Sequence, residues 1–110
     1  MGTRRYYRGG PSLLARMNID VRVDRTTMLL KGGRGVSVYD RPDHPNLIRL
    51  GGAYLLGELP EGLEIIQAGK RDLSHHEIVP ARNLSLTFED YQSLLDRIPL
   101  TPVGSFGPGE

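Results

Sequence analysis

The chain has no cysteine, which excludes disulfides, thiolate metal ligands and a cysteine nucleophile. It also has no apolar run near the roughly 18 residues that a membrane-spanning helix needs. No apolar segment follows the basic residues at the amino terminus, so we expect no secretory signal. Aromatic residues make up only 6% of the chain, which leaves few rings to stack on single-stranded bases. We therefore expect a cytoplasmic protein with neither a metal nor a membrane partner.

The length of 110 residues suits one small domain, and the charge is divided unevenly along it. Residues 1–41 hold nine Lys or Arg against three Asp or Glu, a balance of +6, whereas residues 42–110 hold five against ten, a balance of −5. Twelve of the fourteen basic residues are arginine, whose planar fork suits bidentate phosphate contacts. The basic half can face an anionic ligand, a nucleic acid or an acidic partner, or it can pair with the acidic half within the fold.

Short apolar and alternating segments predict an α+β domain with many short antiparallel strands. Strands are expected at residues 5–8, 19–23, 36–39, 47–50, 53–56, 63–67 and 75–79. Gly51 and Gly52 are expected to join two of them as a hairpin, and Pro60 to Gly62 to form a turn. The two prolines of "DRPDHPN" predict an irregular loop.

Two helices are expected. Pro11 suits the first position of a short early helix, and residues 85–98 give the clearest helical pattern of the chain. Thr87 is the expected N-cap of this late helix, followed three residues later by Asp90. The expected buried stripe consists of Phe88, Tyr91, Leu95 and Ile98. One domain is expected over residues 1–99, followed by a Pro/Gly-rich tail over residues 100–110.

The stretch "GGRGVSVYDR" combines a glycine-rich turn with a strand pattern. It matches neither a Walker loop nor a dinucleotide-binding fingerprint, because the residues and spacing that these motifs need are missing. Its glycines, Gly35 among them, can form an anion-binding nest or an ordinary hairpin turn. Ser37 and Tyr39 share one face of the strand that follows, since strand side chains alternate.

Two further stretches carry candidate functional groups. In "SHHEIVPAR", His75 and Glu77 share a strand face, which suits acid–base chemistry or an ordinary solvated face, while His76 points the other way. A metal site lacks an obvious third ligand, because His44 lies in the expected loop. In "YYR", Arg8 is costly to bury without a partner, so it can hold a phosphate or ribose, or pair with an acid at a rim.

The segments "RYYRG", "GVSVYDR", "LPEGLEI" and "SHHEIVPAR", followed by the late helix, together resemble the Tse-type toxins exported by type VI secretion. The resemblance implies an ADP-ribosyltransferase-like fold of two bent antiparallel β-sheets with a few short helices, and NAD as the substrate bound between the sheets. It implies that Ser37 contacts the ribose or nicotinamide, that His75 is functionally important and that Arg8 binds ribose and phosphates. Tyr39 is expected to stack on a ring, and Gly35 to lie against the cofactor.

The resemblance further implies transfer of ADP-ribose to an intracellular target, or hydrolysis of NAD, and a cognate immunity protein or antitoxin as partner. Such a toxin acts in the producing cell or in a recipient cell after delivery. Glu77 is included as a catalytic residue because it shares a strand face with His75. Two alternatives are a ribonuclease toxin that uses His75, His76 and Glu77, and a nucleotide-binding module without catalysis.

Overall fold

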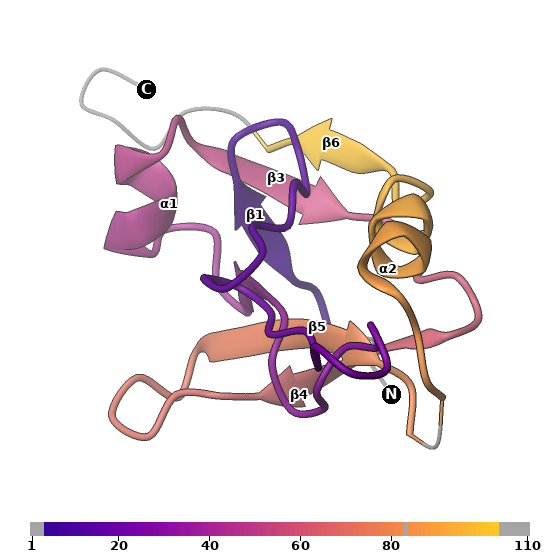
Figure 1. The fold of residues 1–110 in the computed structure, drawn as a ribbon. Coiled ribbons are helices and arrows are strands. Elements are labelled where there is room, and N and C mark those ends of the chain that lie inside the picture. The colour runs from indigo at the N-terminus through magenta and orange to yellow at the C-terminus, as the bar shows by residue number, and fades with distance from the viewer. Residues whose placement is uncertain (1–3, 83, 104–110) are drawn as a thin grey trace.

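The computed structural model describes residues 4–82 and 84–103, which form one six-stranded antiparallel sheet and two helices (Figure 1). The elements in chain order are β1 (Tyr7–Gly9), β2 (Val36–Tyr39), α1 (Pro45–Arg49), β3 (Ala53–Leu56), β4 (Leu63–Gln67), β5 (His75–Pro80), α2 (Phe88–Leu95) and β6 (Leu100–Pro102). The α+β class predicted from the sequence is confirmed. The predicted strand after the Pro60 turn is also found, as β4.

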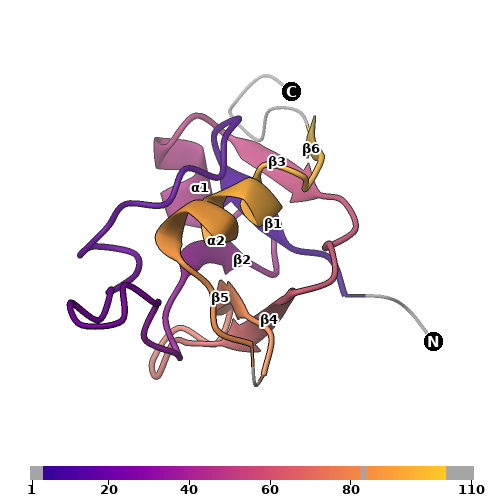
Figure 2. The same ribbon diagram turned by 45° about the vertical axis from the view of Figure 1, so that its right-hand side comes forward.

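The sheet consists of two three-stranded halves with a narrow junction. Its strand order is β4-β5-β2-β1-β3-β6, and Figure 2 shows β4 and β5 on one side of the central strands and β3 and β6 on the other. The central strands β1 and β2 are in register at one residue pair, Tyr7 with Tyr39, whereas β2 pairs with β5 over four residues. In place of the two separate sheets that the resemblance implies, the structure thus has one sheet whose halves part beyond that pair.

Helix α2 covers one face of the β2–β5 half and forms the larger core. Val36, Val38 and Ile78 are completely buried there, together with Tyr91 and Leu95 of the helix. As the sequence predicts, Thr87 caps the helix, because its side chain accepts a hydrogen bond from the Asp90 N–H at 3.1 Å. The predicted stripe is buried except at Phe88, which is only half-buried.

The Tyr91 hydroxyl bridges two strands within this core. It accepts the Val36 N–H at 3.0 Å and donates to the Ile78 carbonyl. Beside it, a Cβ at Gly35 would lie 1.7 Å from the Ile78 oxygen and 2.8 Å from the tyrosine oxygen, so only glycine fits. Helix α2 and the start of β2 are therefore fixed to each other at the residue just before Ser37.

Helix α1 packs on the other half of the sheet, where Tyr7, Leu47 and Ala53 form a second buried cluster. The prediction of a loop through Asn46 and a strand at residues 47–50 is wrong. Pro45 occupies the first turn of the helix, where its missing N–H is not needed. Gly51 and Gly52 then turn the chain into β3, both at positive φ.

The segment between β1 and β2 contains neither the helix predicted after Pro11 nor the strand predicted at residues 19–23. Leu13 and Ala15 are buried while Leu14 is 62% exposed, an alternation that belongs to extended chain and not to a helix. Gln92 of α2 fixes this stretch by accepting the Ala15 N–H at 2.8 Å. Between residues 19 and 23, only isolated bridges form at Val21 and Val23.

The carboxyl-terminal prediction is partly wrong, because Leu100–Pro102 pairs with β3 as strand β6 and is not part of a loose tail. Residues 104–110 of the expected tail lie outside the described residues. Within the part of the chain that the structure describes, neither helix has the length and apolar character needed to span a membrane.

Candidate functional site

Strands β2 and β5 place the predicted polar residues on one face of the sheet. Ser37 is in register with Glu77, and Tyr39 with His75. Val36, Val38 and Ile78 alternate with them along the strands and are buried in the α2 core, so these four side chains lie on the opposite face. The strand alternation read from the sequence is therefore confirmed, and the antiparallel pairing brings together residues 38 positions apart.

Ser37, His75 and Glu77 form a close polar group. The Nε2 atom of His75 lies 2.9 Å from the Ser37 hydroxyl and 3.7 Å from Oε2 of Glu77. The other carboxylate oxygen of Glu77 accepts the Gly35 N–H at 3.0 Å. Both oxygen neighbours thus meet the same ring nitrogen, unlike a Ser-His-acid triad, in which the acid binds the other nitrogen. The group can position a hydroxyl and exchange a proton with it, but it is not a triad.

Tyr39 extends this group through stacked rings. Its ring centroid lies 5.4 Å from that of His75 and 4.1 Å from that of His44, with interplanar angles below 30° in both pairs. The Tyr39 hydroxyl accepts a hydrogen bond from the Asn46 side chain at 2.9 Å. The orientation of the ring beside His75 is therefore set from helix α1.

His44 is buried as the N-cap of α1 and has both ring nitrogens occupied. Its Nδ1 accepts the Asn46 N–H at 3.1 Å, and its Nε2 lies 2.6 Å from the Asp72 carboxylate. An accepting Nδ1 carries no proton, so the ring is neutral and donates from Nε2. Hydrogen bonds from Ser74 and His44 lower the pKa of Asp72 to about 2.

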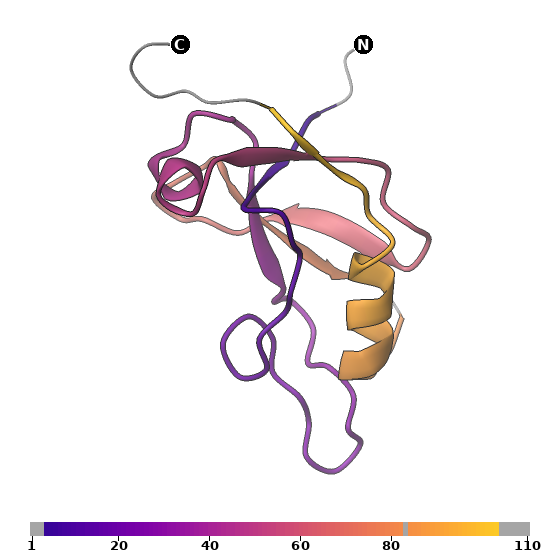
Figure 3. The ribbon, with the colours of Figure 1, turned by 90° about the horizontal axis from the view of Figure 1, so that it is seen from above.

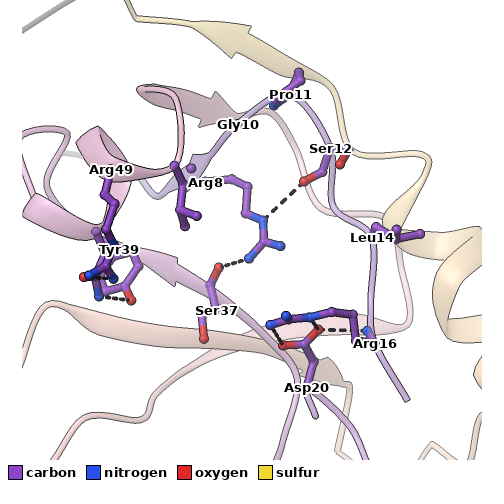
Figure 4. A pocket seen from close by; sticks show the side chains of 13 residues that line it. Arg8, Gly10, Pro11, Ser12, Leu14, Arg16, Asp20, Ser37, Tyr39 and Arg49 are labelled. Carbon is purple, nitrogen blue, oxygen red and sulfur yellow. Dashed lines mark hydrogen bonds and ion pairs between the residues drawn. The ribbon is translucent and has the colours of Figure 1, made fainter. Parts of the chain in front are cut away.

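A cavity of about 530 Å³ opens where β1 and β2 part (Figure 4). Its walls include Ser37 and Tyr39 of β2 and the glycines that follow Arg8. Its charged lining consists of Arg8, Arg16, Arg49 and Asp20. Three guanidinium groups against one carboxylate give the cavity a positive potential, which favours an anionic ligand.

Arg8 is the partly buried cation of this cavity, and no carboxylate of the described residues pairs with it. Its Nη1 donates to the Ser37 carbonyl at 2.8 Å and its Nε to the Ser12 carbonyl at 3.2 Å, as Figure 4 shows. No Asp or Glu side chain of residues 4–82 or 84–103 lies within ion-pair distance of it, and burial lowers its pKa. By contrast, Arg16 pairs with Asp20 at 3.2 Å. The charge of Arg8 is held in place by neutral carbonyls and remains for a ligand.

The structure divides the predicted site residues into two overlapping sets. Arg8, Ser37 and Tyr39 line the cavity, while His75 and Glu77 stand behind Ser37 and are not part of the lining. Ser37 belongs to both sets, since its carbonyl meets Arg8 and its hydroxyl meets His75.

His76 and Gly35 have other contacts than the sequence suggests. His76 is on the opposite face, 3% exposed, with its ring packed edge-on against Tyr6, so it does not join His75 and Glu77. The Gly35 N–H is occupied by Glu77 and does not form an open nest. The structure thus gives Gly35 a positioning contact, and its role in cofactor binding stays a prediction.

Sequence reasoning missed His44, Asp72, Asn46 and Arg49, all of which support Tyr39 or line the cavity. Pro45 directly after His44 is a helix-start signal that could have located His44 and Asn46 at the start of α1. The contact of His44 with Asp72 joins residues 28 positions apart, and no local pattern announces it.

Comparison of the chain with known protein families, with curated proteins and with solved structures finds no match. Within residues 4–82 and 84–103, no group of three or more His, Cys, Asp or Glu side chains is arranged to hold a metal ion. The chemistry of the site therefore has to be inferred from its own residues.

Proposed function

We propose that this chain is a small toxin of the ADP-ribosyltransferase-like class, which binds NAD and transfers ADP-ribose to an intracellular target. The observation that carries the proposal is the cavity at the junction of the two sheet halves, where Arg8 lies beside Ser37 and Tyr39. Its volume of about 530 Å³ is within the range of roughly 300–1,000 Å³ that is typical of small-molecule sites. The division of the sheet also supports this fold, whose two bent sheets enclose the nucleotide.

The lining of the cavity suits both parts of a dinucleotide. Arg8 would bind the diphosphate, with Arg49 adding positive charge at the exposed rim. The exposed side chains of Leu14 and Leu50 also line the cavity and offer apolar contact to a flat ring. A bound ring would gain further contact by stacking on Tyr39.

The polar group behind Ser37 supplies the chemistry. In the transfer, the bond between the ribose carbon and nicotinamide breaks, nicotinamide leaves with the electron pair, and a nucleophile of the target bonds to that carbon. Ser37, held by His75, would hydrogen-bond the ribose or nicotinamide. Positive charge develops on the ribose, and the Glu77 carboxylate, fixed by the Gly35 N–H, would stabilise it electrostatically.

The proposal includes a partner and a place of action. A toxin of this kind needs an immunity protein or antitoxin that blocks the cavity, and the basic first half of the chain would attract an acidic partner. The toxin would act in the cytoplasm, either of the producing cell or of a recipient cell.

The test is incubation of the purified protein with NAD labelled in its ADP-ribose part and with cell lysate. The wild type is compared with His75→Ala and with the control Leu73→Ala, which changes a side chain that is 70% exposed two residues away. The proposal predicts a labelled lysate component with the wild type and the control, and none with His75→Ala.

Other outcomes of this test contradict the transfer. Loss of NAD without labelling would make the protein a glycohydrolase, and NAD binding without turnover would make it a non-catalytic module. Cleavage of the lysate RNA without NAD would favour the ribonuclease alternative, although the burial of His76 removes one of the three residues that it uses.

A further inference from the structure

Residues 21–34, here named the basic arm, form a projecting hairpin, and none of them lines the cavity. Val23 and Leu30 are bridged, and the Lys31 N–H donates to the Arg22 carbonyl at 2.8 Å. The Leu30 N–H donates to the Leu86 carbonyl, which fixes the arm to the body. Figure 3 shows the arm extending away from the sheet.

The basic arm carries four exposed cations: Arg22, Arg25, Lys31 and Arg34. None of them has an Asp or Glu partner within 4.0 Å among the described residues. The acid of the arm, Asp24, accepts the N–H groups of Thr26 and Thr27 at 2.8 and 3.0 Å, and these bonds lower its pKa. Asp24 therefore holds the turn, and the arm keeps an excess of three positive charges.

Three of these cations meet at one hollow of about 530 Å³. It is lined by Arg22, Arg25 and Lys31, with Asn18 and Thr26 as further donors and Asp24 as its one carboxylate. Lining rich in N–H and O–H donors and in positive charge matches phosphate oxygens. The backbone bond between Lys31 and Arg22 keeps two of the cations side by side.

We propose that the basic arm binds the phosphodiester backbone of a nucleic acid. Three of its four cations are arginines, which bind phosphate in a bidentate manner, and the described part of the arm offers no aromatic ring for stacking on bases. The recognition is therefore of the backbone and depends steeply on salt. The arm leads directly into Gly35, whose N–H binds the Glu77 carboxylate, and a nucleic acid held by the arm is a candidate acceptor of ADP-ribose. That last step, unlike the binding, rests on the proposed function.

The test measures binding of two fluorescently labelled probes, a 20-nucleotide single-stranded RNA and a 20-base-pair DNA duplex, by anisotropy at several salt concentrations and without NAD. The arm variant removes the three cations of the hollow: Arg22→Ala, Arg25→Ala and Lys31→Ala. The control variant removes three exposed cations elsewhere and so has the same net charge: Lys70→Ala, Arg71→Ala and Arg97→Ala. We expect the arm variant to bind roughly tenfold or more weakly, and the slope of log K against log salt to fall by about 2 to 3, whereas the control keeps both values.

The proposal is overturned if the wild type binds neither probe, or if both variants lose the same affinity, since net charge alone would then explain the binding. It is also overturned if poly-glutamate competes as well as the probes do, which would indicate an acidic protein as partner. Nicotinamide release from NAD by the wild type and by the arm variant separates the two proposals. Nucleic-acid binding without NAD turnover contradicts only the proposed function, and NAD turnover without nucleic-acid binding contradicts only the role of the basic arm.

Discussion

Removal of one hydroxyl in Tyr91→Phe tests how helix α2 holds the strand that carries Ser37. The hydroxyl accepts the Val36 N–H and donates to the Ile78 carbonyl, and it thereby joins β2 to β5. Tyr91 is completely buried, and this burial raises its pKa, so the hydroxyl stays protonated at neutral pH. Phenylalanine leaves both backbone groups without that partner in a place that water does not reach.

The expected loss follows from these two groups. A buried polar group that loses its partner costs about 1–3 kcal/mol. Val36 and Ile78 are in register, so a small shift lets them bond directly and lowers the total below twice that figure. We expect the free energy of unfolding to fall by about 2 kcal/mol. For a domain of this size, that corresponds to a Tm lower by about 8–16 °C.

Urea and thermal unfolding followed by circular dichroism measure this loss. Tyr54→Phe is the matched control, because Tyr54 is half-buried and its hydroxyl has no hydrogen bond within the described residues. We expect the control to change stability by less than about 0.5 kcal/mol. If Tyr91→Phe is as stable as this control, the hydroxyl does not join the strands and the reasoning is refuted.

Two further predictions concern the residues around the polar group. Gly35→Ala should destabilise the fold by more than about 2 kcal/mol, because the added Cβ would overlap the Ile78 carbonyl. Gly32→Ala, where the added Cβ has open space, should be nearly neutral in the same unfolding assay. Equal stability of the two variants would refute this prediction. The lowered pKa of Asp72 means that its ionised form stabilises the fold above pH 4 and that this contribution is lost as pH falls from about 4 to about 2. Ser74→Ala removes the largest cause, so the pKa of Asp72 followed by carboxyl NMR should rise toward 3.8, and an unchanged pKa would contradict the assignment.

The sequence correctly predicted the elements whose start depends on residues close together in the chain. Thr87 with Asp90 marks the start of α2, and the turn at Pro60 marks the start of β4. Both signals act within a few residues, so the sequence is enough to place these elements.

The early part of the chain was predicted poorly because distant contacts determine it. Leu13 and Ala15 are extended because the side chain of Gln92, in a helix some 77 residues away, binds their backbone. Helix α1 was missed because the prolines around it suggest a loop, although Pro45 fits the first turn of a helix.

Only part of the candidate site could be predicted, because some of its contacts are also between residues distant in the sequence. Alternation along a strand placed Ser37 with Tyr39 and His75 with Glu77 on common faces. It did not show that the Ser37 side of β2 and the His75 side of β5 lie on the same face of the sheet, nor that the neutral His44 would stack on Tyr39. Both contacts depend on the whole fold.

The most direct test of the central claim, that NAD is bound and cleaved at the cavity of Arg8, is nicotinamide release by purified protein. Wild type is compared with Arg8→Ala and with Arg97→Ala, a control that removes one exposed cation that is not part of the cavity lining. A lost charged hydrogen bond of about 1.5–3 kcal/mol predicts a KM for NAD that is roughly 10- to 100-fold higher in Arg8→Ala and unchanged in the control. No release by the wild type, even with lysate present, or an unchanged KM in Arg8→Ala, would contradict the claim.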